Sequence, residues 1–472
     1  MLDHHRIAQM PSECRHQTIT APVLSPAVRG LSGLAIIALA AGFLCFFVMI
    51  AAVAGDRDTP ETMLSPAAKR VVAAGDMFAL GAAALVLMQL CLACRFKFLD
   101  RIFGLSRLLA AHRAVGVSAV ALGTLHPLFI FAPAQRALGP LRPEIWPAMV
   151  GMALLAGLWA AVCLSLWRGL LRLAFPLWWR MHRAGAFVGT MLLGAHVLNV
   201  NGDFEQGWPR WAFIAALVAY GAVLMRHKAV KPALLRSHGF TVTGLSQRGR
   251  NVYAVELSPV QGAVFSYLPG QFAFVSFQSL SLSAEEHHFT LSSTPTRPGS
   301  IIFTIKSSGD FTACIGSLRA GDTAFVDGPY GLFSHLARGR HTAGELIMIA
   351  GGIGITPMLS MLRYMSDVQD KRALTLVWSN RTSEDIFCRE ELESIGRALP
   401  HLAIHYVLTR EADSAGNKVR LDAGTLQHLL DGCSRGAAVF ICGPPPLMHA
   451  VTKGLAALGF KRRQIFTERF SL

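Results

Sequence analysis

The chain has 472 residues, of which 52% are hydrophobic and 15% are charged, whereas soluble proteins carry about 25% charged residues. Lysine and arginine outnumber aspartate and glutamate by 44 to 29, which gives a net charge of +15. This composition excludes a wholly soluble protein. The apolar content indicates that the positive charge serves to contact a membrane surface or phosphate-bearing ligands and not nucleic acid. The nine cysteines are scattered, which excludes a dense disulfide scaffold.

The first half of the chain is predicted to be a membrane domain. Six apolar runs each approach the ~20 residues that a helix needs to cross hydrocarbon; they lie at 31–54, 71–94, 111–132, 146–167, 183–201 and 211–225. The first run is too long and too late for a signal peptide. We therefore expect residues 1–30 to form a polar tail and residues 31–228 to form a six-helix bundle that contacts lipid.

The lysines and arginines between these runs predict the orientation of the bundle. Sixteen lie on one side, for example within 95–113, and only six lie on the other side, where six acidic residues balance them. Cytoplasmic loops carry the excess of positive charge in membrane proteins. We therefore expect a multi-pass protein of the cell inner membrane with both termini in the cytoplasm.

Four histidines lie inside predicted spans, where ionisable residues are costly and usually functional. His112 and His126 are on the third span, and His182 and His196 are on the fifth. A separation of 14 residues returns to nearly the same helix face after ~21 Å. Both spans run outward from the cytoplasm, so His112 can meet His182 and His126 can meet His196. Facing imidazoles can ligate haem iron, which predicts two haem b groups; hydrogen-bonded interior histidines or a proton relay are the alternatives.

An arginine follows each inner histidine, at Arg113 and Arg183. At the cytoplasmic interface these guanidinium groups could pair with haem propionates. They could equally extend toward lipid headgroups. Both interpretations stay open from the sequence.

Two soluble domains are predicted after the last span. Short β-rich segments separated by Pro-Gly, Ser and Gly-Asp turns predict an antiparallel barrel over 236–340. A strand, glycine turn, helix and second strand then predict a parallel-sheet α/β domain over 345–472.

The glycine turn of the α/β domain has the character of a phosphate-binding loop. Its small residues let the backbone approach a pyrophosphate at a helix N-terminus; the candidate contacts are Gly351, Gly352, Gly354, Thr356 and Pro357. Ser379 and Arg381 lie at the end of the next strand, where an arginine can pair with a 2′-phosphate. This favours NADPH over NADH.

Cys442, Gly443 and Pro444 end the last predicted strand. There they could place a small polarisable side chain beside a nicotinamide ring. A tight turn without a catalytic role is the alternative.

These motifs occur in an order that resembles a known combination. Residues from about 240 onward resemble the ferredoxin–NADP reductase-type flavoprotein module, and the two His-x13-His helices resemble the transmembrane domain of the NADPH oxidase and ferric reductase family. The resemblance implies a multidomain chain with a six-helix bis-haem bundle, an FAD-binding antiparallel β-barrel and an NADP-binding α/β domain.

The resemblance also implies the flavin contacts. The family's His-Pro-Phe-Thr motif corresponds to residues 287–290, with His288 in place of proline. By resemblance, Phe289 packs on the flavin, Thr290 hydrogen-bonds near flavin N5 and His287 helps to hold the diphosphate. Further contacts implied in the same way are Pro269, Gln271, Lys306, Gly309 and Thr312.

The resemblance assigns catalytic positions to Thr290, Cys442 and Phe470, the last being the aromatic residue that covers the flavin; a frayed tail is the alternative for Phe470. The implied enzyme passes hydride from NADPH to FAD and single electrons through the inner and then the outer haem. Oxygen giving superoxide is the leading external acceptor, with chelated ferric ion close behind. An electron-supply subunit for a partner protein or quinone and a haem-free membrane anchor are the alternatives.

Overall fold

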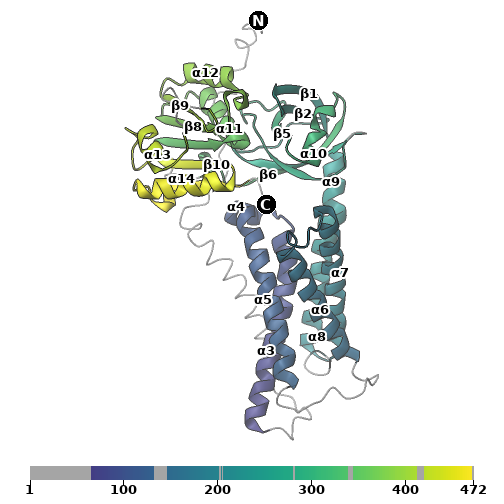
Figure 1. Ribbon diagram of the computed structural model, residues 1–472. Helices are drawn as coiled ribbons and strands as arrows, with labels where there is room; N and C mark the ends of the chain where they lie inside the picture. The colour runs from purple at the N-terminus through teal and green to yellow at the C-terminus, as the bar shows by residue number, and fades with distance from the viewer. Residues whose placement is uncertain are drawn as a thin grey trace.

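The computed structural model describes residues 65–131, 146–200, 204, 206–279, 282–337, 344–411 and 419–469. In this part of the chain, a column of long helices carries two soluble domains at one end (Figure 1). The predicted tail, the first predicted span at 31–54 and Phe470 lie outside the described residues.

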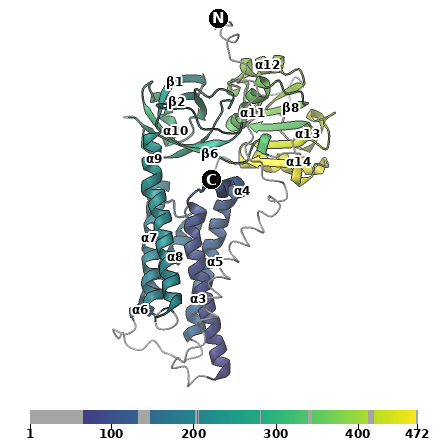
Figure 2. The ribbon, with the colours of Figure 1, turned by 180° about the vertical axis from the view of Figure 1, so that it is seen from behind.

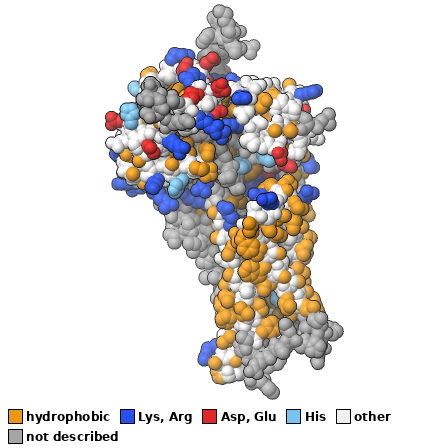
Figure 3. Space-filling model, viewed as in Figure 1, with side chains coloured by type: hydrophobic (Ala, Val, Ile, Leu, Met, Phe, Trp, Pro, Cys, Tyr) orange, Lys and Arg blue, Asp and Glu red, His pale blue; other side chains and the backbone are white. Residues whose placement is uncertain are grey.

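The column is built from long apolar helices joined to short ones at the soluble end. The helices are α3 (Pro66–Ala93), α4 (Lys97–Phe103), α5 (Leu105–Phe131), α6 (Trp146–Leu166), α7 (Phe175–Asn199), α8 (Trp208–Met225), the π-helical turn η5 (Arg226–Val230) and α9 (Lys231–Ser237). Helix α3 packs along α5, and α6 packs along α7. Hydrophobic side chains cover the column, whereas charged side chains gather over the soluble domains and the junction (Figure 3).

Four described stretches are long and apolar enough to cross a membrane: Pro66–Ala93, Leu105–Phe131, Trp146–Leu166 and Trp208–Ser237. Helix α7 has 25 residues and packs in the same column, but Arg180, His182 and Arg183 make it more polar than these four. The structure thus supports a helical membrane domain, and the number six stays a prediction.

The direction of the helices determines which histidines share a depth. Helices α5 and α7 both run away from the soluble domains, whereas α3, α6 and α8 run toward them (Figures 1 and 2). The positively charged segment Arg95–Arg107 lies at the soluble end, as the orientation argument expects for a cytoplasmic surface.

The first soluble domain is an antiparallel sheet with a buried core. Its strands are β1 (Phe240–Gly249), β2 (Val252–Pro259), β3 (Phe272–Gln278), β4 (His287–Thr290), β5 (Ile301–Lys306) and β6 (Thr323–Tyr330), in the order β4-β3-β6-β1-β2-β5. An antiparallel bridge between Leu291 and Phe303 links the two ends of the sheet. The short helix α10 (Asp310–Ala313) follows β5. Alternate apolar residues such as Val255 and Leu257 face inward and form the core.

The second soluble domain is a parallel sheet in the order β11-β10-β7-β8-β9. Its strands are β7 (Leu346–Gly351), β8 (Leu374–Asn380), β9 (Leu402–Leu408), β10 (Ala438–Cys442) and β11 (Ile465–Glu468), and its helices are α11 (Ile355–Asp367), α12 (Arg389–Ala398), α13 (Ala423–Leu429) and α14 (Pro445–Ala457). Separate hydrophobic clusters involve α11 with α12 and α13 with α14. Strands β7, β8 and β10 are fully buried, as covered parallel strands are. The expected antiparallel and parallel domains are therefore present.

Candidate functional site

The four membrane histidines form two pairs between α5 and α7. The ring centroids of His112 and His182 lie 6.1 Å apart, and those of His126 and His196 lie 6.3 Å apart. The first pair is nearer the soluble domains because it lies near the starts of both helices. The structure thus pairs His112 with His182 and His126 with His196, as the sequence spacing predicted.

Backbone carbonyl groups orient three of these four rings. The Nδ1 atom of His126 lies 3.0 Å from the carbonyl oxygen of Gly75, and that of His196 lies 2.8 Å from Pro147 O. The Nδ1 atom of His112 lies 3.3 Å from Gln89 O. A carbonyl can only accept, so Nδ1 carries the proton and Nε2 keeps the lone pair that a metal requires.

The fourth ring, of His182, is held by aromatic contacts. Trp178 stacks on it with a centroid distance of 5.3 Å and an interplanar angle of 24°. Its Nδ1 atom is buried and has no hydrogen-bond partner among the described residues. A buried polar atom of this kind is unfavourable unless something else satisfies it.

The spacing within each pair fits an iron held from both sides. A metal–nitrogen bond of ~2.0 Å and about 1.1 Å from nitrogen to ring centre, taken twice, give about 6.2 Å between centroids. The observed values are 6.1 and 6.3 Å. Among the described residues no group of three or more His, Cys, Asp or Glu side chains could hold a metal, so these pairs are the candidate metal sites there.

Close packing on α6 adds a requirement at the outer pair. A Cβ atom on Gly151 would lie 2.5 Å from Cε1 of His196, far inside van der Waals contact. Glycine at position 151 is therefore needed for His196 to occupy its position. Sequence reasoning missed this residue, because nothing in the α6 sequence indicates which helix face approaches α7.

The two arginines beside the inner pair are exposed. Arg113 and Arg183 both point out of the helix packing, and the Arg183 guanidinium lies 5.9 Å from the Trp179 ring centroid. These positions agree with either of the two roles expected from the sequence.

The barrel motifs predicted to bind flavin meet at strands β3 and β4. Thr290 is buried and pairs with Phe272 across the two strands. The Gln271 side chain accepts a hydrogen bond from Leu268 N–H at 2.7 Å and donates one to Gly331 O at 2.9 Å. Pro269 is buried beside it.

The remaining predicted flavin residues lie farther along the barrel. His287 stacks on Phe311 at 3.9 Å, and Phe289 packs against the barrel core. The Thr312 hydroxyl accepts the backbone N–H groups of Ser308 and Gly309, both at 2.9 Å. His288 points to the other face of β4, where its ring lies 5.8 Å from that of Phe274.

The glycine turn lies between β7 and α11, as the sequence predicted for this segment. A Cβ atom on Gly354 would lie 2.3 Å from Cys442 O, so only glycine allows β10 to approach the turn. A Cβ atom on Gly351 would lie 2.9 Å from Cδ of Pro444, and one on Gly443 would lie 3.1 Å from the backbone of Gly351. Thr356 and Pro357 are buried in the first turn of α11, and Pro444 is exposed before α14.

The Cys442 side chain is buried at the end of β10. Burial, and then the negative charge of Glu468, raise the pKa of its thiol well above the ordinary value. The group is therefore a neutral thiol at physiological pH. Its proposed place beside a nicotinamide stays a prediction.

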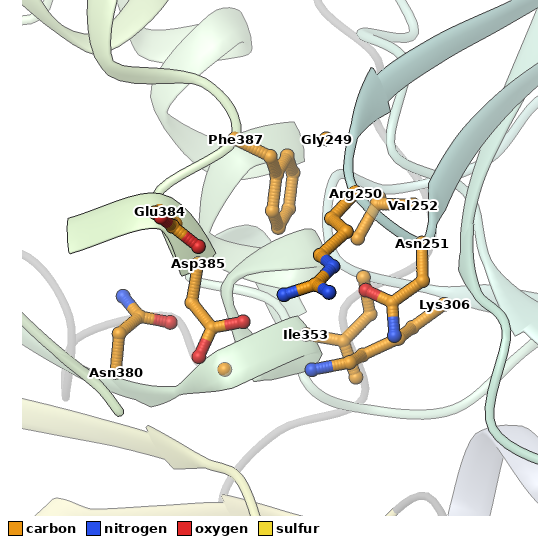
Figure 4. Close-up of a pocket in the computed structure, with 11 residues that line it drawn as sticks. Gly249, Arg250, Asn251, Val252, Lys306, Ile353, Asn380, Glu384, Asp385 and Phe387 are labelled. Atoms are coloured by element: carbon orange, nitrogen blue, oxygen red, sulfur yellow. The ribbon is translucent and has the colours of Figure 1, made fainter. Parts of the chain in front are cut away.

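A shallow, solvent-open cleft lies between the two soluble domains (Figure 4). Arg250 and Lys306 line it from the barrel, and their charged ends point into it. Glu384 and Asp385 line it from the parallel-sheet domain. The cleft thus has one basic wall and one acidic wall, and the turn residue Gly352 also lines it.

Sequence reasoning missed the buried polar group of this cleft, Asn380 at the end of β8. Its side chain is 5% exposed, and neither its amide oxygen nor its amide nitrogen has a hydrogen-bond partner in the described part of the chain. Ser379 is buried, whereas Arg381 is exposed and does not line the cleft. An unsatisfied amide facing a cleft suits a ligand that both donates and accepts, such as a ribose.

Comparisons with known proteins agree with this arrangement. Residues 78–193 match the family described as ferric reductase like transmembrane component, residues 237–334 match an FAD-binding domain, and residues 348–453 match the oxidoreductase NAD-binding domain. The fold and these matches define a membrane-bound flavoprotein reductase. The chain is a ferric-reductase-like transmembrane domain fused to a ferredoxin–NADP reductase-like module, and it is an NAD(P)H-dependent oxidoreductase.

Curated relatives are similar to the soluble half. The reductase component of propane 2-monooxygenase from Rhodococcus jostii is 28% identical over 49% of this chain and 62% of its own length. The glycine betaine monooxygenase reductase subunit from Chromohalobacter salexigens is 32% identical over 44% of this chain and 58% of its own. NADH-cytochrome b5 reductase 1 from Mortierella alpina is 26% identical over 58% of this chain and 91% of its own. The chain thus spans less than two thirds of the first two relatives.

Proposed function

We propose that the protein carries electrons from NAD(P)H through FAD and two haem b groups to an acceptor on the opposite side of the cell inner membrane. The two histidine pairs carry this proposal, because their ring centroids lie 6.1 and 6.3 Å apart. Three of the rings have Nδ1 hydrogen-bonded to a backbone carbonyl, which leaves the Nε2 lone pair available to a metal. Molecular oxygen, giving superoxide, is the leading acceptor, and chelated ferric ion is the second. The flavin supplies the conversion between a two-electron hydride donor and one-electron carriers.

Each part of the chain has a separate role in this proposal. His112 and His182 would hold the inner haem, and His126 and His196 would hold the outer haem. The barrel would hold FAD through Pro269, Gln271 and the segment 287–290, and the glycine turn would receive the coenzyme pyrophosphate. The positive segment at the soluble end supports a cytoplasmic location for both soluble domains.

The cleft supports NADH over NADPH, in contrast to the expectation from Arg381. Glu384 and Asp385 line the cleft on the same side as Asn380, where their charges would repel a 2′-phosphate, whereas Arg250 and Lys306 line the opposite side. The side-chain amide of Asn380 has no hydrogen-bond partner among the described residues and is uncharged, so it can bond to the hydroxyl groups of a ribose. The NADH-dependent relative named above agrees with this choice.

The absorption spectrum of the purified membrane protein tests the haem part of the proposal. We expect a Soret band that NADH reduces under anaerobic conditions, and reoxidation on separate addition of oxygen or ferric chelate. His126→Ala and His196→Ala should each remove one haem, whereas the exposed control His428→Ala should remove none. A protein without Soret absorption would contradict the proposal and favour a haem-free anchor.

A second candidate function follows from the relatives, which are reductase components. In this alternative the outer haem reduces a partner protein or a quinone. Purified protein whose haem is reduced by NADH but is reoxidised by neither oxygen nor ferric chelate would favour it.

A further inference from the structure

Asp100 lies where the membrane domain meets the flavin-binding barrel. It is on α4, between the spans α3 and α5, and its side chain is 2% exposed. The two carboxylate oxygens have different partners. Oδ1 accepts the backbone N–H of Leu105 at 2.7 Å, and Oδ2 accepts the backbone N–H of Gly331 at 2.9 Å.

These two partners belong to the two halves of the proposed electron path. Leu105 is the first residue of α5, and His112 follows seven residues later on the same helix, ~10 Å along its axis. Gly331 directly follows β6, and its carbonyl oxygen accepts the Gln271 side chain at 2.9 Å. One carboxylate therefore links the helix of the inner histidine to the barrel motif predicted to bind flavin.

Other contacts surround this link and support the same alignment. Arg95 forms an ion pair with Glu286 at 2.7 Å, and its guanidinium lies 3.9 Å from the Phe274 ring centroid. Lys97 donates a hydrogen bond to Gly328 O. Lys231 on α9 pairs with the buried Asp327 at 2.6 Å.

An apolar cluster fills the space beside these polar contacts. Leu105 packs with Phe272, Phe274 and Tyr330, which come from β3 and β6. Two helices of the column, α4 and α9, also contact β6. The barrel is therefore attached to the column at several points. Within the part of the chain that the structure describes, only Asp100 bonds directly to both the first residue of α5 and the strand end beside Gln271.

We infer that Asp100 is a positioning residue that sets the distance and orientation of the flavin site relative to the inner histidine pair, and thereby the rate of electron transfer between them. The inference rests on the proposed function, because it concerns a step between flavin and haem. Electron transfer rates fall exponentially with separation, so a small displacement of the barrel suffices to slow this step while leaving reactions within the barrel intact. If Asp100 acted only as a helix cap, its loss would not slow electron transfer to the haem more than the reactions within the barrel.

The test uses Asp100→Asn in the full-length purified protein. Asparagine keeps the shape but presents an NH2 group where one of the two N–H donors needs an acceptor. Three measurements are made: haem content, NADH-driven reduction of ferricyanide, which collects electrons directly from reduced flavin, and the anaerobic rate of haem reduction after mixing with NADH. We expect haem reduction to slow by about tenfold or more, with the other two changed by less than about twofold. Unchanged haem reduction would overturn the inference.

Two further variants and one direct structural measurement complete the test. Asp422→Asn removes a comparable backbone-capping carboxylate from the N-terminus of α13 and should leave all three quantities unchanged. If Asp100→Asn loses haem, Asp100→Glu is tested in its place, because glutamate keeps the charge and both acceptor oxygens but lengthens the link between Leu105 and Gly331; unchanged haem reduction in that variant would then overturn the inference. Hydrogen exchange should show loss of protection at the Leu105 and Gly331 amides in Asp100→Asn, and retained protection would contradict the linkage.

The failure of the proposed function is distinguishable from the failure of this inference. Wild-type protein without haem, or with haem that NADH cannot reduce, contradicts the proposed function. Wild-type protein with haem that NADH reduces, together with an Asp100→Asn variant of equal rate, contradicts the inference alone.

Discussion

The imidazole rings of His126 and His196 face each other from two helices that run in the same direction, with centroids 6.3 Å apart. Each ring donates from Nδ1 to a carbonyl of a different neighbouring helix, Gly75 on α3 and Pro147 on α6. The outer pair is thus oriented by four helices at once. These hydrogen bonds orient both rings and leave both Nε2 lone pairs available to a metal.

The close approach of α6 to this pair gives a specific mutational prediction. Gly151→Ala places a Cβ atom 2.5 Å from His196 Cε1, so the ring must move and the outer haem should be lost. Gly157→Ala on the same helix is the matched control, because nothing described lies within 4 Å of its added Cβ. Haem content from the pyridine haemochrome spectrum should fall from two to one only for Gly151→Ala. Equal haem content in both variants would show that His196 is not a ligand.

The order of the two haems can be tested at the inner pair. His112→Ala should remove the inner haem and leave the outer haem, because the two pairs share no ligand. NADH should then reduce the flavin but not the remaining haem, which dithionite should still reduce. Rapid reduction of that haem by NADH would show that the inner pair is not on the path.

The acidic wall of the cleft makes a prediction about coenzyme choice. Removing both charges by Glu384→Gln with Asp385→Asn should tighten NADP⁺ binding by about thirtyfold, since two like-charge contacts that each cost on the order of 1 kcal/mol are removed. NAD⁺ binding should change little. Glu393→Gln, an exposed site on α12, is the control for general charge effects. Calorimetric titration with both coenzymes measures the ratio, and tighter NADP⁺ than NAD⁺ binding in the wild type would contradict the assignment.

The junction carboxylate predicts a pH dependence of stability. Burial raises the pKa of Asp100 to about 6 from an ordinary 3.8, although two backbone N–H groups oppose the shift. The folded protein therefore binds this proton more tightly than the unfolded chain, and the contribution to the free energy of unfolding falls as pH rises from about 4 to about 6. The carboxylate thus reduces stability at neutral pH, which fits a positioning role better than a stabilising one.

Thermal melting of the wild type and Asp100→Asn between pH 4 and pH 7 tests this sign. Asparagine does not titrate, so the Tm of the variant should rise relative to that of the wild type as pH increases. A difference in Tm that is independent of pH would mean that Asp100 has an unshifted pKa.

The sequence predicted most of what depends on local periodicity. Apolar runs indicated the spans, strand and turn signals indicated the two soluble domains, and the spacing of His112 and His126 indicated a shared helix face. The structure contains these features because they depend only on residues that lie close together in the chain. The first span and Phe470 lie outside the described residues and stay predictions.

The features that the sequence did not reveal depend on contacts between distant segments. Gly331 is 231 residues from Asp100, and no local pattern indicates that they meet. Arg250 lines the cleft between the soluble domains from a hairpin of the barrel, and Asn380 is buried whereas its neighbour Arg381 is exposed. No local pattern indicates that the Asn380 side chain is buried without a hydrogen-bond partner among the described residues, and the role predicted for Arg381 stays a prediction.

The hydrogen bonds from Nδ1 to backbone carbonyls have an evolutionary consequence. Every residue type offers a carbonyl oxygen, so the acceptors of His112, His126 and His196 survive substitution wherever the helices keep their packing. The side chains of α3 and α6 can therefore diversify while the rings keep their orientation. Orientation of the histidines by backbone carbonyls therefore tolerates substitution at most positions of the membrane domain. The positions that should tolerate it least are the histidines themselves and the few small residues that let helices approach them.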